Sequence, residues 1–149
     1  MTRIQPLLGS LKDDARLALV KAVAGFDASV AGNLLTFVSF DQDPKIRAAA
    51  MAGLTRCPNQ QGMAINAFRN EQDVTVKLAM LGAFSEAPCD ALLPDMIVLL
   101  NDPTYGRLAR TVLTTANKGH DRGAHDFDWV DWLKERNAPK ITTAQAEIR

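Results

Sequence analysis

Several features are scarce in this chain, and each scarcity argues against a class of protein. Two cysteines in 149 residues are too few for a disulfide framework, and two histidines leave few ligands for a metal centre. The 17 Lys and Arg residues balance the 17 Asp and Glu residues, so no net field attracts nucleic acid or an anionic membrane. No stretch approaches the roughly 18 apolar residues of a membrane span, and the opening MTRIQPLLGSLKDD lacks a signal-peptide pattern. We therefore expect a soluble protein of the cytoplasm.

Strand patterns are also missing. No segment alternates apolar and polar residues with the period of two that marks a half-buried strand. Apolar residues recur instead at intervals of three and four, in segments separated by turn residues. The chain is predicted to be all-α, with helix, turn and helix in succession.

One segment of the chain returns. Asp41 to Leu54, DQDPKIRAAAMAGL, comes back as EQDVTVKLAMLGAF from Glu71 to Phe84. A weaker copy, DPTYGRLARTVL, begins at Asp102, and a degraded copy, DDARLALVKAV, begins at Asp13. A period of about 30 residues indicates helix pairs stacked on one another. We predict an α-solenoid of about four short helix pairs.

The two strong copies carry their own helix signals. Asp43 and Asp73 stand where an N-cap belongs, and Pro44 occupies the first helical position. We expect glycines in these helices to mark close packing. The helical spacing predicts two core faces: Ile46, Ala49, Ala50, Gly53 and Leu54 in the first copy, and Val76, Ala79, Met80, Ala83 and Phe84 in the second.

The repeated motif has the form D-x-D-P-x-[VI]-[RK], followed by small residues and a leucine. It stands here as Asp41 to Arg47 and, without the proline, as Glu71 to Lys77. This motif resembles the second helix of HEAT repeats, and the short phycobilisome-lyase type of HEAT-like repeat is most similar. The resemblance covers about residues 2–136. It implies a solenoid whose second helices line the concave side.

The end of the chain departs from the repeat. Asp126 to Arg136, DFDWVDWLKER, is predicted to be a last helix that carries Trp129 and Trp132. It resembles the Trp-bearing terminal helix of many bacterial HEAT-like proteins. Because the end of a solenoid must cover an apolar face, we predict that this helix is a cap. The repeat domain is expected to span residues 1–136, and residues 137–149 are expected to form a flexible tail.

Charged residues of the motif are predicted to link neighbouring repeats. The first acid of each copy lies in a turn, where it can accept hydrogen bonds from backbone N–H groups. It can also pair with the basic residue of its own or the adjacent repeat. The expected ladder is structural and consists of Asp41, Arg47, Glu71 and Lys77.

Residues beside the core faces are more apolar than a solvated surface requires. Aligning the copies forms two rows of four, and six of these eight residues are apolar. Such a surface suits an amphipathic, partly acidic helix or peptide, whereas packing between repeats is the alternative explanation. The rows are Leu17, Ala48, Leu78 and Arg107, then Val20, Met51, Leu81 and Arg110. The predicted binding residues are Leu17, Val20, Met51, Leu78, Leu81, Arg107 and Arg110, and the basic edge comprises Arg16, Lys21, Arg47, Lys77, Arg107 and Arg110.

These patterns favour a non-catalytic scaffold or adaptor that binds a protein segment and needs no cofactor. Neither a nucleophile elbow nor a phosphate loop is present. Cys57 and Cys89 are expected to be packed thiols, and His120 and His125 lie in a loop segment without the helical pairing of a metal site. One alternative is nucleic-acid or phosphate binding through the basic row, as in HEAT-like DNA-repair glycosylases. Another, which rests on the resemblance alone, is a subunit of a chromophore lyase or a related modifying enzyme.

Overall fold

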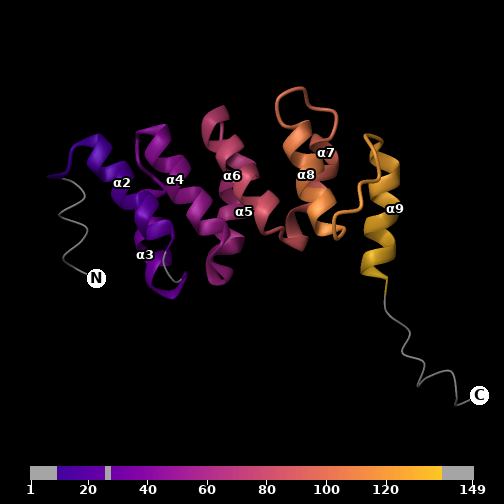
Figure 1. Cartoon of the computed structure of the whole chain (residues 1–149), viewed down its shortest axis with the longest axis horizontal. Helices are drawn as coiled ribbons and strands as arrows, with labels where there is room; N and C mark the ends of the chain where they lie inside the picture. Colours follow the sequence, from indigo (N-terminus) through magenta and orange to yellow (C-terminus); the bar gives the residue numbers. More distant parts are fainter. Residues whose placement is uncertain (1–9, 26–27, 139–149) are drawn as a thin grey trace, which may run out of the picture.

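A computed structural model describes residues 10–25 and 28–138, and residues 1–9 and 139–149 of the expected domain and tail lie outside it (Figure 1). All regular structure in the described ranges is helical, which confirms the all-α prediction. These described ranges contain eight α-helices and two short 3-10 helices. Their bounds are α2 Asp13–Ala24, α3 Ala28–Val38, α4 Pro44–Thr55, η1 Pro58–Gln60, α5 Gln61–Asn70, α6 Val74–Glu86, η2 Asp90–Leu92, α7 Leu93–Leu99, α8 Gly106–Ala116 and α9 Asp126–Asn137.

The helices follow one another along the long axis of the molecule, from α2 at one end to α9 at the other (Figure 1). Helix α4 packs between α2 and α6, and α6 packs in turn against α8. Helices α3 and α5 also contact α4, while α7 contacts α8 and α9. Most contacts therefore join elements that are close in the sequence.

The predicted N-caps explain where the central helices begin. The Asp43 carboxylate accepts a hydrogen bond from Lys45 N at 2.8 Å, and Pro44 opens α4. Asp73 accepts from Thr75 N at 2.8 Å and Val76 N at 3.1 Å at the start of α6. These bonds satisfy amide groups that lack a partner within the helix. In the third copy, Asp102 caps a turn and the helix begins only at Gly106.

Helix α4 is covered on most of its circumference. Leu54 and Phe84 are fully buried, which confirms the core position predicted for both. Residues on other sides of α4, including Met51, are buried as well. Helices α2 and α6 pack on either side of α4, and α3 and α5 also contact it, so only part of its surface reaches solvent. The core therefore extends well beyond the stripe that the spacing predicts.

Of the three repeat-helix glycines expected to mark close packing, Gly53 and Gly106 lie at close contacts. A Cβ on Gly53 would come within 2.8 Å of both the Ala24 Cβ and a Leu35 methyl group. A Cβ on Gly106 would lie 2.4 Å from the Leu100 carbonyl oxygen. At Gly82 no heavy atom lies within 4 Å of an added Cβ, so the expectation of close packing is wrong there.

The two environments predict opposite effects of the same substitution. Gly106→Ala should destabilise the protein by about 1–3 kcal/mol, because the α8 backbone must move away from Leu100. Gly82→Ala should stabilise it by about 0.5–1 kcal/mol, because alanine lowers the conformational entropy of the unfolded chain and its Cβ meets no atom in the folded state. Urea denaturation of both variants measures the difference. Equal effects of the two substitutions would contradict the close approach at Gly106.

Candidate protein-binding surface

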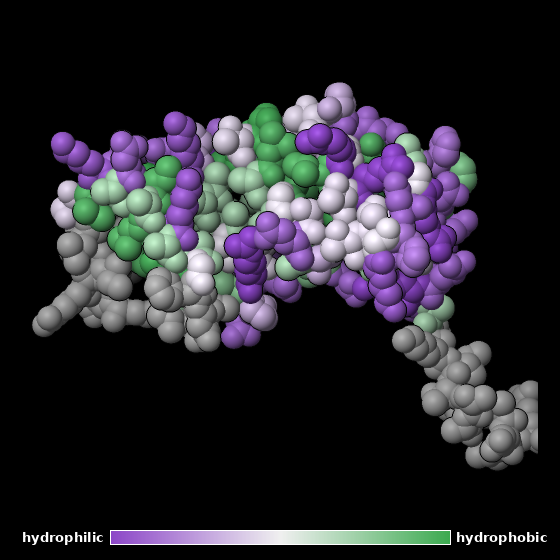
Figure 2. Space-filling view, viewed as in Figure 1, coloured by the Kyte–Doolittle hydropathy of each residue, from purple (hydrophilic) through white to green (hydrophobic). Residues whose placement is uncertain are grey.

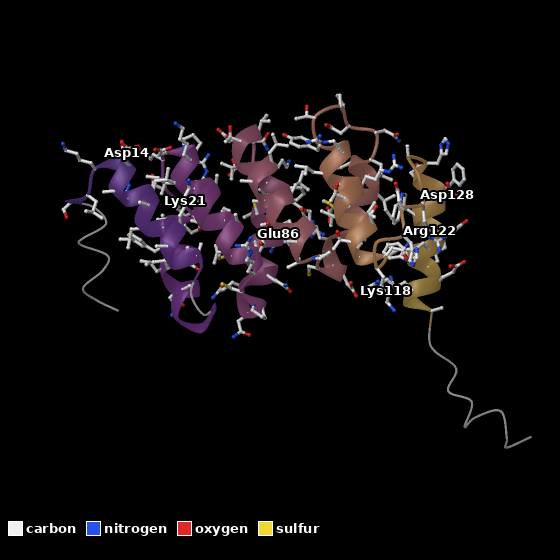
Figure 3. All side chains as sticks on the ribbon, in the orientation of Figure 1. Asp14, Lys21, Glu86, Lys118, Arg122 and Asp128 are labelled. Atoms are coloured by element: carbon white, nitrogen blue, oxygen red, sulfur yellow. The ribbon has the colours of Figure 1, made fainter. Side chains whose placement is uncertain are left out.

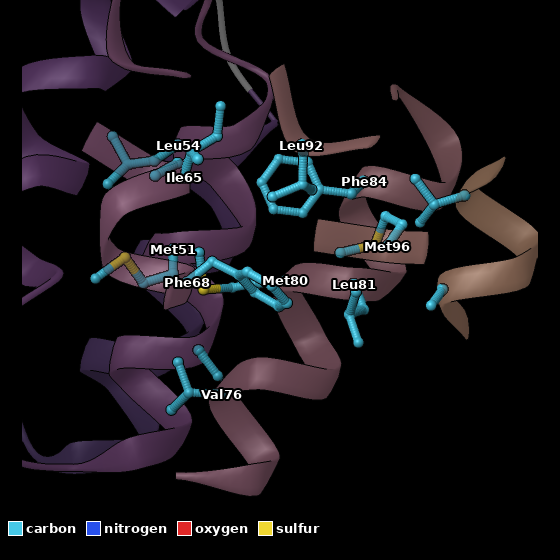
Figure 4. Close-up of a cluster of buried hydrophobic side chains, with 14 of the residues drawn as sticks. Met51, Leu54, Ile65, Phe68, Val76, Met80, Leu81, Phe84, Leu92 and Met96 are labelled. Carbon is cyan, nitrogen blue, oxygen red and sulfur yellow. The ribbon is translucent and has the colours of Figure 1, made fainter. Parts of the chain in front are cut away.

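Three of the predicted binding residues are core residues. Val20 is 1% exposed, Met51 6% and Leu81 0%, so the expectation that they line a surface groove is wrong. Figure 4 shows Met51 and Leu81 among the buried side chains of the core, in the same cluster as Phe68 and Met80. The physical reason is that each lies on a side of its helix that a neighbouring helix covers.

The remaining predicted residues lie at the surface but do not form one site. Leu17 and Leu78 are half-buried, and Arg107 is exposed. Arg110 forms a bidentate pair with Asp121, with its Nε 2.9 Å from the Asp121 Oδ1. Hydrogen bonds from Arg110 and from Gly123 N–H lower the pKa of the Asp121 carboxyl. Arg110 thus holds the loop before α9 in place.

The groove on this part of the molecule is formed by neighbouring positions of the same helices. A depression of about 290 Å³ lies across α2, α4 and α6, and we call it the alanine groove. Its floor is made of Ala48, Ala49, Ala52 and Ala79, with Leu17 at the α2 side. Lys21, Lys45 and Thr75 complete its lining. The groove therefore has a flat apolar floor with two ammonium groups at its edge.

The surface view agrees with this placement. In the face seen in Figure 2, hydrophobic residues gather over α2, α4 and α6, whereas the α8 and α9 end is mostly hydrophilic. Figure 3 places Lys21 between the ribbons of α2 and α4 in the same orientation. Apolar surface bordered by charge is typical of a surface that binds another molecule.

The two lysines of the groove have no carboxylate partner among the described residues. Within residues 10–25 and 28–138, neither Lys21 nor Lys45 has an ion pair, and both are exposed. By contrast, Arg56, just after α4, pairs with Glu86 at the C-terminal end of α6. A carboxylate that enters the groove would therefore find two cations not already neutralised by the described part of the protein.

A row of ion pairs joins the turns of successive repeats. Arg16 donates to Asp41 at 3.2 Å, and Arg47 donates to Glu71 at 3.2 Å. Each acid also organises its own turn, since Asp41 accepts from Asp43 N and Glu71 from Asp73 N, both at 2.9 Å. These partially buried pairs connect α2 to α4 and α4 to α6.

Lys77 does not continue this row of ion pairs. Its ammonium group lies 5.4 Å from the centre of the Phe68 ring and 5.7 Å from that of Tyr105. Position 101 of the third copy is asparagine, so no acid is available at the equivalent turn. Cation–π contacts with the two rings take the place of the missing carboxylate.

Glu71 makes stability dependent on pH. Burial opposes its ionisation, but hydrogen bonds from Asp73 N, Arg47 and Gln72 N outweigh burial and lower the pKa of Glu71. A lowered folded-state pKa contributes stability above the unfolded-state value of about 4.3, and this contribution is lost as pH falls through the folded-state value.

Replacing this carboxylate tests the contribution. Glu71→Gln should reduce the free energy of unfolding by about 1 kcal/mol at pH 7, and the difference should begin to shrink below about pH 4 and vanish below the lowered folded-state pKa of Glu71. Urea titrations at several pH values measure it. Glu86→Gln is the matched control, because its pair with Arg56 is exposed and should contribute less. A constant difference at all pH values would mean that ionisation of Glu71 is irrelevant.

The other candidate chemical groups do not form a site. Cys57 is buried, and burial raises the pKa of its thiol, while Cys89 is half-buried. His125 stacks on Phe127 at a ring distance of 5.3 Å. In the described part of the chain, no three His, Cys, Asp or Glu side chains gather as metal ligands. No described helix is both long and apolar enough to cross a bilayer.

Comparison with known proteins gives no further assignment. The chain matches no protein-family model, no curated protein and no solved structure. The alanine groove is therefore interpreted from its own residues.

Proposed function

We propose that this protein is a non-catalytic adaptor that binds an amphipathic, partly acidic helix or peptide in the alanine groove. The observation that carries the proposal is an apolar floor of four alanines edged by Lys21 and Lys45, two lysines without an ion pair among the described residues. Alanine side chains end at Cβ, so a partner backbone can approach the helices closely. Apolar side chains of the partner would contact the floor, and its carboxylates would pair with the lysines.

The proposed architecture is a cytoplasmic α-solenoid of about four short HEAT-like helix pairs. Side-by-side packing of α2, α4, α6 and α8 supports it, since each contacts the next. In such a solenoid these are the second helices, and the alanine groove lies on their concave side. Helix α9, with Trp129 and Trp132 buried, is the cap.

Binding of nucleic acid is not favoured by the charge arrangement. Arg16, Arg47 and Arg110 each pair with a carboxylate, so half of the six predicted basic residues are neutralised within the protein. Phosphate binding would need several free cations along one path. The alanine groove offers two.

A pair of synthetic peptides tests the proposal. The first is a fluorescent helical peptide with a leucine and alanine face flanked by glutamates, and the second has lysine at every glutamate position. The protein should bind the acidic peptide and discriminate against the basic one, as measured by fluorescence anisotropy. Added salt should weaken binding by screening the exposed charges.

Substitutions identify the surface. Ala52→Phe should fill the groove and weaken binding about tenfold or more, as expected for loss of a central contact. Lys21→Glu with Lys45→Glu should reverse the preference between the two peptides. Arg107→Glu is the matched control, because Arg107 is exposed but lies outside the groove lining. Unchanged binding in the groove variants, or no binding of either peptide, would refute the proposal.

A further inference from the structure

A second apolar groove lies at the other end of the molecule, between α7 and α9. It encloses about 430 Å³, and its walls include Pro94, Ile97 and Val98 from α7 and Val130 and Leu133 from α9. The Val98 side chain is 81% exposed, and Val130 is 37% exposed. Part of the exposed apolar surface of the described residues thus lies beside the last helix.

Helix α9 differs from the usual last element of a helical stack. Helix α9 is the last element of the row (Figure 1). A terminal element normally presents a polar outer face, because nothing else covers it. Here α9 exposes two apolar side chains, Val130 beside α7 and Phe127, the latter 59% exposed. Another packed element is needed to cover these side chains.

The charges of α9 indicate what that element is. Asp126, Val130 and Lys134 stand at i, i+4 and i+8, so they form one row along the helix. The row has an acid at one end, an apolar residue in the middle and a base at the other end. Such rows lie alongside each other when two helices cross at about 50°. An antiparallel copy of the same row matches it, since each acid then lies beside a base.

We propose that α9 is a self-association surface, on which a second copy of this chain packs in antiparallel orientation about a two-fold axis near Val130. Asp126 of each copy pairs with Lys134 of the other, and the apolar surface of Val98 and Val130 is covered. Lys134 contacts Asp131 at 3.0 Å within one chain, but both side chains are exposed, so Lys134 can exchange partners. A two-fold contact uses the same surface on both copies and therefore closes at a dimer. The alanine groove, formed by α2, α4 and α6, stays open in this dimer.

Sedimentation velocity of the full chain tests the proposal. The expected result is a monomer–dimer equilibrium that strengthens with concentration. Val98→Glu should weaken the dimer at least tenfold without affecting the fold, because Val98 is almost fully exposed. Val74→Glu is the control, since Val74 is also exposed, at 48%, and lies at the start of α6. A dimer that is equally sensitive to both substitutions would overturn the proposal.

Charge exchange tests the antiparallel arrangement. Asp126→Lys and Lys134→Asp should each weaken self-association. In a dimer of either variant, residues 126 and 134 carry the same charge, so both pairs between the two copies become repulsive. An equimolar mixture of the two variants should restore the dimer, because both pairs are then attractive. Failure of the mixture to associate would refute the proposed pairing.

Two further results would overturn the proposal as a whole. One is a full chain that remains monomeric up to about 1 mM, where even weak interfaces are populated. The other is dimerisation only after removal of residues 139–149, which would assign the groove to the chain's own C-terminal segment. Neither result depends on peptide binding in the alanine groove, so the two proposals fail independently.

Discussion

Replacing Met51 and Leu81 together by glutamate is expected to unfold the protein. Met51 is 6% exposed and Leu81 0%, and both belong to the continuous apolar core (Figure 4). An unpaired carboxylate in such a place costs several kcal/mol or must take up a proton. Two of them approach the total stability of about 5–15 kcal/mol that an ordinary domain has. Circular dichroism should show loss of helical structure at pH 7, with partial recovery in acid.

Controls on the same helices separate burial from charge. Lys45→Glu with Thr75→Glu also introduces two carboxylates into α4 and α6, but both positions are exposed, so the fold should persist. Met51→Leu with Leu81→Met conserves volume and should cost less than about 1.5 kcal/mol for each substitution. If the double glutamate variant folds and keeps the wild-type midpoint of unfolding, Met51 and Leu81 are not core residues.

The repeat and its helix signals could be predicted because they are local. Asp43 and Asp73 cap the helices that follow them, and Pro44 occupies a position where a missing amide proton has no cost. These effects depend on a few neighbouring residues. Leu54 and Phe84 lie on the side of the helix that any packing arrangement would bury. The helical spacing predicts the burial of these two large side chains.

The binding surface could not be predicted because it depends on which sides of a helix its neighbours cover. The side chains of adjacent residues in an α-helix point in directions about 100° apart around the helix axis. Met51 and Ala52 are neighbours in sequence, yet the first is buried and the second lines the alanine groove. Only the packing of α2 and α6 against α4 decides between them. The position of Lys45 at the edge of the groove could not be predicted for the same reason.

Long-range pairing is equally hidden from the sequence. Arg110 was expected at a binding surface, but Asp121 in the following loop neutralises it. Lys77 was expected to face an acid, but two aromatic rings lie beside it. In both cases the basic residue is bound within the protein. The lysines of the alanine groove differ from these residues in their surroundings, because neither has an ion pair among the described residues.

Trp129→Ala is expected to cost about 3–5 kcal/mol, the range found when a large buried aromatic side chain is truncated. Trp129 is fully buried, packs edge-on against Trp132 at a ring distance of 5.5 Å, and donates from Nε1 to the Gly123 carbonyl at 2.9 Å. Trp129→Phe keeps most of the ring volume and loses this bond, so it should cost only about 1–2 kcal/mol. Urea denaturation measures both losses, and limited proteolysis shows whether α9 detaches first. If Trp129→Ala unfolds at the wild-type midpoint with α9 still protected, Trp129 does not anchor α9.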